Sequence, residues 1–337
     1  MLYYTTIFSY NTKELHMRKK SSISIRDIAE ELGLNISTVS RALNRSYLIS
    51  DKTTKLVLRK AHEMGYLFEQ TKKNIVVLLP PSDTDLAWYS ISLINALQMR
   101  LRETEYYWEF INEDKIDIIQ ERSVAGIISL DFAHSVAIQI TQKYNLPLVC
   151  INNASNHIDS VYSVNSDAES ALRTSFNCLY EHGHKNIAYI TYHNDSFAGK
   201  KRSIAFEKII REYNLKDNCI FVRDHVENYH GIILDLYKKG ITGIITDGES
   251  AGLRIWNSLN YCKIEVPRQM SLVAWEMPHV SDMVSPAITT VQQNFNLIAE
   301  KALYLLEAQF KKEQVSEDIF VPYLLHMRNT VSIPRDI

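Results

Sequence analysis

Apolar residues near the amino terminus recur with the spacing of short helices. Ile25, Ile28, Ala29 and Leu32 stand at i, i+3, i+4 and i+7, which is one side of an α-helix. Gly33 follows directly, where a residue in the left-handed conformation commonly ends a helix. The pattern predicts a first short helix that buries one stripe and stops at Gly33.

A second helix is predicted after this turn, with Asn35 as its N-cap. Its buried side consists of Val39, Ala42 and Leu43. The opposite face carries Ser37, Arg41 and Asn44 at i, i+4 and i+7, so it is small, polar and basic. Two short helices joined by a glycine turn, the second with such a face, are typical of a helix-turn-helix whose recognition helix enters the DNA major groove. We expect Arg41 to matter most for sequence reading.

A third helix is predicted after a cap at Ser50 and Asp51. The residues that face inward are Val57, Ala61 and Met64. The residues that face outward are Lys52, Lys55 and Arg59, which can reach DNA phosphates. The amino-terminal segment is therefore predicted to be a three-helix DNA-binding head.

Beyond residue 74, short apolar runs alternate with amphipathic segments of helix length. Strands are predicted at 75–79, 108–111, 124–130, 148–151, 187–191, 220–222, 242–246 and 272–275. Helices are predicted at 86–103, 135–144, 168–181, 201–213, 229–238, 250–259 and 295–310. This alternation is typical of parallel sheets covered by helices on both faces. The predicted fold class is α + α/β: a helix-turn-helix domain followed by a core of two doubly wound parallel-sheet subdomains.

The same pattern suggests domain boundaries. Residues 1–16 are expected to be a disordered leader, with Met17 as the hypothetical natural start. The predicted head is 17–66, the linker 67–74, the first core subdomain 75–160 with 288–320, and the second 161–287 with 321–337. The chain should cross between subdomains near 160 and 288. Ligands in such folds bind at the carboxyl ends of strands, and two halves can close on them by hinging.

Charge is distributed unevenly, although the chain as a whole carries only −2. Residues 17–74 contain 12 Lys and Arg against 6 Asp and Glu, whereas residues from 75 onward contain 24 against 32. Because Lys and Arg that neutralise phosphates supply most non-specific affinity for DNA, only the basic head is expected to approach the double helix.

Several other classes of protein are disfavoured by what the sequence lacks. No apolar run is long enough to span a bilayer, and the first sixteen residues lack the basic and apolar regions of a secretory signal. The four cysteines stand far apart with no CxxC pair, which suits reduced thiols in the cytoplasm. No GxGxxG, GxxxxGK[ST] or GxSxG motif occurs, and His182 and His184 lack a third ligand nearby for a metal. We expect a cytoplasmic protein that is not an enzyme and holds no cofactor or metal.

Three blocks of the head carry a more specific signal. They are Ile25-Arg26-Asp27-Ile28-Ala29, Ser37-Thr38-Val39-Ser40-Arg41-Ala42-Leu43-Asn44 and Ala61-His62-Glu63-Met64-Gly65-Tyr66. In this order and spacing they resemble the DNA-binding domain of the LacI/GalR family of repressors. The resemblance implies that Ile36, Ser37 and Arg41 read base edges, while Asn44 and Tyr66 hold structural or backbone-contacting positions. With the outward lysines, the candidate DNA-binding residues are Ile36, Ser37, Thr38, Arg41, Asn44, Lys52, Lys55 and Tyr66.

The linker departs from the family pattern. Members usually follow the Gly-Tyr pair with Pro-Asn and a short hinge helix that wedges apolar side chains into the minor groove. Here only residues 66–74 separate Gly65 from the first core strand, and both features are missing. Leu67 and Phe68 could form a reduced wedge, but packing against Met64 is the favoured interpretation.

The core also resembles this family, as far as about Leu325. The matching pieces are 181–188 with its His-Gly-His, 202–206, Asp247 with Ser250 and Gly252, Val266-Pro267, 273–276, and Pro286 with 289–291. The resemblance implies an effector domain like that of sugar-binding proteins. Two departures stand out: Ala274-Trp275-Glu276 replaces the usual Gly-Phe-Asp, and Thr246 stands where Asn usually precedes Asp247.

By position in the family, or in the loop and helix start after the first core strand, the candidate effector-binding residues are Asp83, Trp88, Tyr89, Asn152, Arg202, Asp247, Trp275, Glu276 and Gln293. Carboxylate and guanidinium groups suit the hydroxyls of a saccharide, and aromatic rings suit its apolar face. Structural roles remain open for several of them: Arg202 as a surface guanidinium, Trp275 as a packing residue, and Asp247 and Glu276 as helix caps.

These observations predict a homodimeric repressor of a carbohydrate-utilisation operon. Its two heads would bind a pseudo-palindromic double-stranded operator, and its core would bind a sugar or related effector that shifts operator affinity. The alternatives are a sugar-binding transport protein, an enzyme such as a sugar kinase or hydrolase, and a regulator that has lost its effector response.

Overall fold

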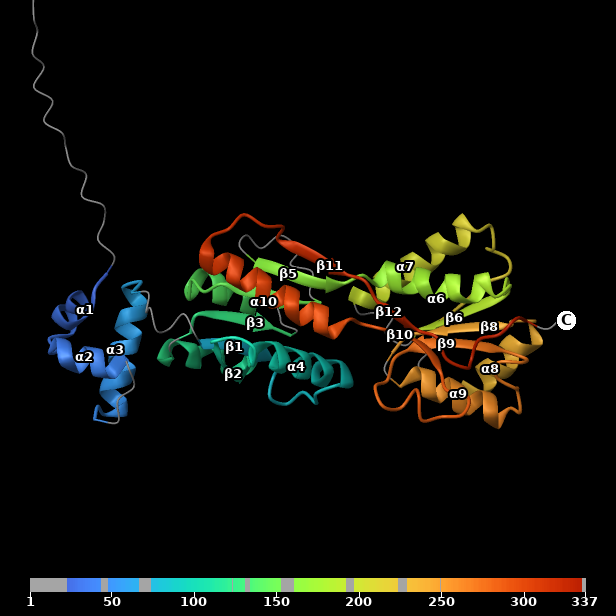
Figure 1. Cartoon of the computed structure of the whole chain (residues 1–337), viewed down its shortest axis with the longest axis horizontal. Coiled ribbons are helices and arrows are strands. Elements are labelled where there is room, and N and C mark those ends of the chain that lie inside the picture. Colours follow the sequence, from blue (N-terminus) through green and yellow to red (C-terminus); the bar gives the residue numbers. More distant parts are fainter. Residues whose placement is uncertain are drawn as a thin grey trace, which may run out of the picture. The chain divides into compact units, whose positions relative to one another are not determined.

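The computed structural model describes residues 23–43, 48–66, 74–122, 124–130, 134–152, 161–191, 197–223, 229–248 and 250–334 (Figure 1). The chain divides into two compact units, residues 1–71 with 117–123 and residues 72–116 with 124–337. The predicted leader, the site residue Asn44 and linker residues 67–73 lie outside the described residues.

The head consists of α1 (Ile25–Leu32), α2 (Ile36–Leu43) and α3 (Asp51–Glu63). Ser24 and Asp27 form a capping box at the start of α1, and Gly33 ends that helix with a φ of 61°. Ser50 caps α3 by accepting a hydrogen bond from the backbone of Thr53. The fully or almost fully buried apolar residues of the head are Ile28, Ala29, Val39, Ala42, Val57, Leu58 and Ala61. The predicted three-helix head is confirmed, with the predicted helix end at Gly33 and the predicted cap at Ser50.

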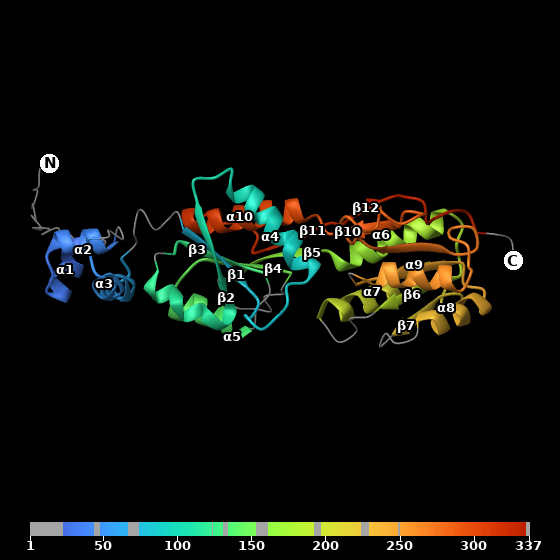
Figure 2. The same cartoon turned by 90° about the horizontal axis from the view of Figure 1, so that it is seen from below.

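The first sheet of the core has six strands in the order β11-β5-β4-β3-β1-β2. They are β1 (Asn74–Leu79), β2 (Tyr107–Asn112), β3 (Gly126–Ser129), β4 (Leu148–Ile151), β5 (Val161–Ser166) and β11 (Asp318–Val321). Neighbouring strands pair in parallel throughout. Helices α4 (Trp88–Leu101) and α10 (Phe295–Lys311) pack together over one face, and α5 (His134–Ile138) lies toward the other (Figure 2). The remaining short helices of this subdomain are η2 (Glu113–Glu121) and the π-helix η3 (Gln139–Lys143).

The second sheet has six strands in the order β12-β10-β9-β8-β6-β7. They are β6 (Ile187–Thr191), β7 (Ile220–Arg223), β8 (Gly243–Thr246), β9 (Ser271–Trp275), β10 (Thr289–Gln292) and β12 (Leu324–His326). Only β12 is antiparallel, to β10. Helices α6 (Ala168–Glu181) and α7 (Phe197–Glu212) cover one face, and α8 (Tyr229–Lys238) and α9 (Ala251–Tyr261) cover the other (Figure 1).

The chain crosses between the two sheets at places that differ from the prediction. Residues 161–166 form β5 of the first sheet, so the first crossing follows Ser166 and does not lie near 160. Residues 289–292 form β10 of the second sheet, so the return follows Gln292 and not 288. A third crossing joins β11 to β12. These four strands, β5, β10, β11 and β12, were not predicted because polar and apolar residues are mixed along them.

His184 ties the carboxyl-terminal segment to the second sheet. Its side chain is buried, and Nε2 lies 2.8 Å from the carbonyl oxygen of Ser332 while Nδ1 lies 2.9 Å from Oγ1 of Thr242. A carbonyl oxygen only accepts hydrogen bonds, so the neutral ring carries its proton on Nε2. Burial lowers the pKa of His184, and the neighbouring His182 adds to this, although the bond to Ser332 opposes it.

We predict that this histidine makes the core less stable in mild acid. Below the ordinary histidine pKa of about 6.5, the unfolded chain takes up a proton that folded His184 does not, so the free energy of unfolding falls until the folded pKa is reached. His184→Gln should flatten the pH dependence of the denaturation midpoint between pH 7.5 and 5.5. The exposed-residue control His279→Gln should not, and equal slopes in all three proteins would contradict the prediction.

Candidate functional site

The recognition helix α2 presents most of the predicted base-reading residues to solvent. Ile36 is 47% exposed although it is apolar, and Ser37 and Arg41 are exposed on the same helix. Thr38 is half-buried, so it belongs partly to the packing of the head. An exposed apolar residue beside Ser and Arg suits a groove that offers both thymine methyl groups and hydrogen-bonding base edges.

The basic residues of α3 divide into two kinds. Lys52 and Lys55 are exposed, as expected of residues that contact phosphates. Lys60 lies 3.0 Å from Glu63 and 3.6 Å from Glu31 of α1, and the hydrogen bond to Glu63 raises its pKa. Lys60 therefore links two helices of the head. Tyr66 packs against the buried cluster of the head, which agrees with its predicted structural position.

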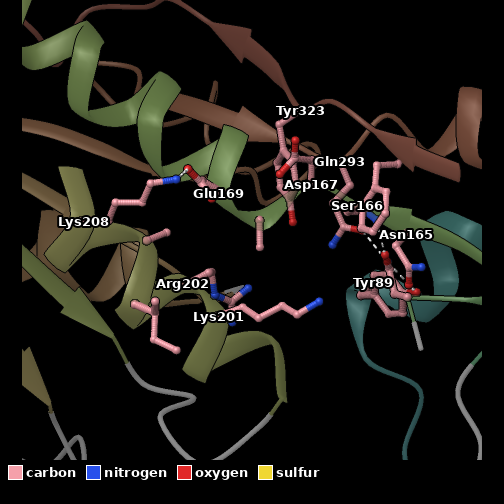
Figure 3. Close-up of a pocket in the computed structure, with 15 residues that line it drawn as sticks. Tyr89, Asn165, Ser166, Asp167, Glu169, Lys201, Arg202, Lys208, Gln293 and Tyr323 are labelled. Carbon is pink, nitrogen blue, oxygen red and sulfur yellow. Dashed lines mark hydrogen bonds and ion pairs between the residues drawn. The ribbon is translucent and has the colours of Figure 1, made fainter. Parts of the chain in front are cut away.

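The core contains a cavity of about 510 Å³ where the crossing segments meet α6 and α7 (Figure 3). Among the predicted effector residues, Tyr89, Asn152, Arg202 and Gln293 line it. Its other lining residues are Asn165, Ser166, Asp167, Ala168, Glu169, Lys201, Ile204, Ala205, Lys208, Phe320 and Tyr323. A cavity of this size is within the range of small-molecule sites.

One end of the cavity is a cluster of amides and hydroxyls. The side-chain nitrogen of Asn152 donates to the hydroxyl oxygen of Tyr89 at 2.9 Å and to Oε1 of Gln293 at 2.7 Å. Its side-chain oxygen accepts from the backbone of Ser166, whose hydroxyl donates to Gln293. Asn152 adopts a φ of 53°, which asparagine tolerates better than most residues. The cluster thus joins the ends of β4 and β5 to the segment that follows β10.

A buried ion pair occupies the middle of the site. Nε of Arg202, on α7, lies 2.6 Å from Oδ2 of Asp247, which follows β8. Tyr189 of β6 donates to the same carboxylate oxygen at 2.8 Å. Burial opposes the charge of Arg202, but the attraction of Asp247 and the contributions of the neighbouring Tyr189 and Tyr323 together outweigh it, and the pKa of Arg202 is raised. Burial, with the negative charge of Asp247, also raises the pKa of Tyr189, so its hydroxyl stays protonated and donates.

Two aromatic side chains hold this arginine in place. The Arg202 guanidinium carbon lies 5.7 Å from the centre of the Trp275 ring, in cation–π range. The ring of Trp275 meets that of Tyr323 edge-on at 5.8 Å. Trp275 is 8% exposed and does not line the cavity, so in this structure it packs against Arg202.

An exposed ion pair forms the other end of the cavity. Nζ of Lys208 lies 2.7 Å from Oε1 of Glu169, which is also 3.1 Å from Arg173. The hydrogen bonds from Lys208 and Arg173 lower the pKa of Glu169, so the carboxylate stays ionised. Asp167 stands between the two ends and caps α6 by accepting from the backbone of Ser170 at 3.0 Å.

Some predicted effector residues lie elsewhere. Asp83 and Trp88 are exposed and do not line the cavity. The Glu276 side chain is 5% exposed and lies 2.8 Å from Arg328, with a further hydrogen bond from Thr290. Its placement as a ligand-facing residue is therefore not supported, because its carboxylate already pairs with the half-buried guanidinium of Arg328. Asp247 is fully buried beneath Arg202 and reaches the cavity only through it.

Several lining residues were missed from the sequence. From the sequence, Asp167 is interpreted as an ordinary helix cap, and Lys201 and Lys208 as surface lysines of an amphipathic helix. A period of three to four residues from Lys201 to Lys208 was the available signal, since it places both on one side of α7. The crossings that bring Phe320 and Tyr323 to the cavity had no comparable signal.

Two further kinds of feature, a metal site and a membrane-spanning helix, were sought among the described residues. No group of three or more His, Cys, Asp or Glu residues there is placed to hold a metal ion. None of its helices is both long and apolar enough to cross a membrane.

A helix-turn-helix head joined to a two-sheet core with a cavity at its crossings defines a DNA-binding regulator with a ligand-binding domain. Residues 24–67 match the model of the lacI family of bacterial regulatory proteins, and residues 176–331 match that of a periplasmic binding protein-like domain. The chain therefore combines a LacI-family DNA-binding domain with a periplasmic binding protein-like domain, the composition of a DNA-binding transcriptional regulator.

Relatives of similar length support this assignment. The HTH-type transcriptional regulator RegA of Clostridium saccharobutylicum is 27% identical over 88% of this chain and 96% of its own length. The HTH-type transcriptional repressor PurR of Actinobacillus pleuropneumoniae is 24% identical over 86% of this chain and 91% of its own length.

Solved structures show the same fold. A lac repressor dimer bound to operator and an anti-inducer has a TM-score of 0.64 at 18% identity, covering 92% of this chain and 99% of its own. The CelR–cellobiose complex also has a TM-score of 0.64, at 17% identity, covering 92% of this chain and 100% of its own.

We predict that Arg41→Ala removes sequence preference while Lys55→Ala does not. Losing a side chain that contacts base edges should lower the ratio of specific to non-specific affinity by about 10- to 100-fold. Losing a phosphate contact should weaken binding to all duplexes and reduce the salt slope by about one. Fluorescence anisotropy with an operator selected from a random duplex pool, and with its scrambled version, measures both. A wild-type specificity ratio in Arg41→Ala would show that α2 does not read the bases.

We predict that Arg328→Ala destabilises the core far more than Glu276→Gln. Removing Arg328 leaves a buried carboxylate without its partner, which costs about 3 kcal/mol, at the low end because the Arg328 side chain is 20% exposed. Glutamine keeps the shape and most hydrogen bonds of Glu276. Urea denaturation gives both values, and equal losses in the two variants would contradict this account of the pair.

Proposed function

We propose that this chain is a cytoplasmic, homodimeric repressor of a carbohydrate-utilisation operon, controlled by a sugar or related polyhydroxylated metabolite in the cavity. Two heads on one dimer would read half-sites about one helical turn apart. The ligand acts by binding the DNA-competent and released conformations with different affinity.

The observation that carries this proposal is the set of polar groups around Arg202. The Arg202 guanidinium lines the cavity, and Asp247 pairs with its Nε. Asp167 adds a carboxylate to the same cavity, and Asn152, Asn165 and Gln293 add amides. Donors and acceptors alternate over a short distance, as the hydroxyls of a sugar require. The ring of Tyr89 offers an apolar surface for the sugar's C–H face.

The relatives are consistent with these partners. The lac repressor in the matching structure is a dimer bound to operator, and CelR is in complex with cellobiose. One observation favours a second candidate, a regulator without effector response. The Glu276 side chain is 5% exposed and pairs with Arg328, so its carboxylate is not available to a ligand. The cavity lined by Arg202 and Asp167 favours the responsive form.

We predict that Arg202→Lys lowers affinity for the ligand and leaves affinity for the operator unchanged. Lysine keeps the charge opposite Asp247 but loses the planar donor fork, so affinity for the ligand should fall by about 100-fold. Operator affinity without ligand should stay within about twofold of wild type, since Arg202 belongs to the core and not to the DNA-binding head, so the change affects only the coupling. Titration calorimetry with a sugar panel and anisotropy with operator measure the two quantities.

Arg268→Lys is the matched control, because Nε of Arg268 also pairs with a carboxylate, Glu265, at 2.8 Å on the exposed surface. It should bind ligand as wild type does. A wild type that binds operator but no sugar in the panel would favour the unresponsive regulator.

A further inference from the structure

The cavity has a second polar end that one sugar ring in the first end would leave empty. Tyr89, Asn165 and Gln293 lie at one end, Lys208 and Glu169 lie at the other, and Arg202 lies between them (Figure 3). A ring held by the amide cluster and Arg202 would therefore not reach the Lys208–Glu169 pair.

The volume of the cavity agrees with this length. A cavity of about 510 Å³ lies within the roughly 300–1,000 Å³ that small-molecule sites span, so it has room for a ligand of two rings. Two linked rings would fill the space more completely than one.

One side of α7 lines the second end of the cavity. Lys201, Ile204, Ala205 and Lys208 all line the cavity at i, i+3, i+4 and i+7. Ile204 is 66% exposed, which leaves its apolar side chain uncovered between two lysines. An apolar patch flanked by hydrogen-bonding groups suits a sugar ring, which has C–H faces and a polar rim.

The charges at this end favour a neutral unit. Glu169 pairs with Lys208 at 2.7 Å and with Arg173, which also pairs with Glu212 at 2.7 Å, so two acidic and two basic groups balance. The Lys208–Glu169 pair therefore offers fixed hydrogen-bond donors and acceptors, and the little net charge around it would not attract an ionic group. A neutral ring with several hydroxyls can bond to both partners without breaking the pair.

We infer that the ligand of this regulator has two linked rings, a disaccharide or a glycoside, with the second ring seated on Ile204 and bonded to Lys208 and Glu169. The inference rests on the proposed function, because it assigns the first ring to the site around Arg202. It makes Lys208 a determinant of ligand length.

The test is titration calorimetry of the full chain with glucose and galactose and with maltose, cellobiose and lactose. Wild type should bind at least one disaccharide more tightly than its component monosaccharides. Lys208→Ala should weaken that disaccharide by about tenfold, as the loss of a charge-assisted hydrogen bond does, and should change monosaccharide affinity by less than about twofold.

Lys239→Ala is the matched control. Lys208 and Lys239 have side chains that are each 54% exposed, and each pairs with one carboxylate, at 2.7 Å and 2.6 Å. Lys239 does not line the cavity. The control should bind every sugar as wild type does, and thermal melting of both variants should match, because exposed ion pairs add little stability.

The second subsite and the proposed function can be contradicted by different results. Monosaccharides that bind wild type as tightly as any disaccharide, or a Lys208→Ala variant with unchanged disaccharide affinity, would overturn the second subsite and leave the proposed function standing. Wild type that binds no sugar at all would overturn both. A second variant, Ile204→Asn, should repeat the selective loss for disaccharides.

Discussion

The burial of Arg202 against Asp247 is the interaction on which the ligand site depends. A guanidinium and a carboxylate taken out of water must be paired closely, since either alone would cost several kcal/mol. The pair joins α7 to the end of β8, and Tyr189 and Trp275 complete its surroundings from β6 and β9. A charged donor group is thereby held rigidly at the wall of the cavity, which is the preorganisation that selective binding requires.

A second buried pair, Arg328 with Glu276, has a different consequence. It links the end of β9 to the segment after β12, and Arg328 also donates to the backbone of Ile288. The two pairs stand near the carboxyl end of the same sheet, yet only one reaches the cavity. This contrast explains why two acidic residues at corresponding strand ends, Asp247 and Glu276, do not have equivalent roles.

The location of the cavity connects ligand binding to motion. Ser166, Gln293 and Tyr323 belong to the three segments that cross between the sheets, and all three line the cavity. Any relative movement of the two subdomains changes the backbone at these crossings. A ligand that contacts them directly has different contacts in the open and closed arrangements, which is what coupling to the operator requires. The amide cluster around Asn152 already joins two of these crossings without a ligand.

The sequence by itself determined the head, most elements of the core and part of the site. Local periodicity and caps such as Ser50 and Gly33 depend on neighbours a few residues away, so they can be read directly. The resemblance suggested Arg202, Asn152 and Gln293, and the place of Tyr89 after the first core strand suggested Tyr89; all four line the same cavity. Only the tertiary structure decided three other features. They are the strands at the crossings, the ion pair of Glu276 with Arg328, and the ion pair of Lys208 with Glu169. Each depends on contacts between residues dozens of positions apart, and such partners leave no local pattern of hydrophobicity or charge.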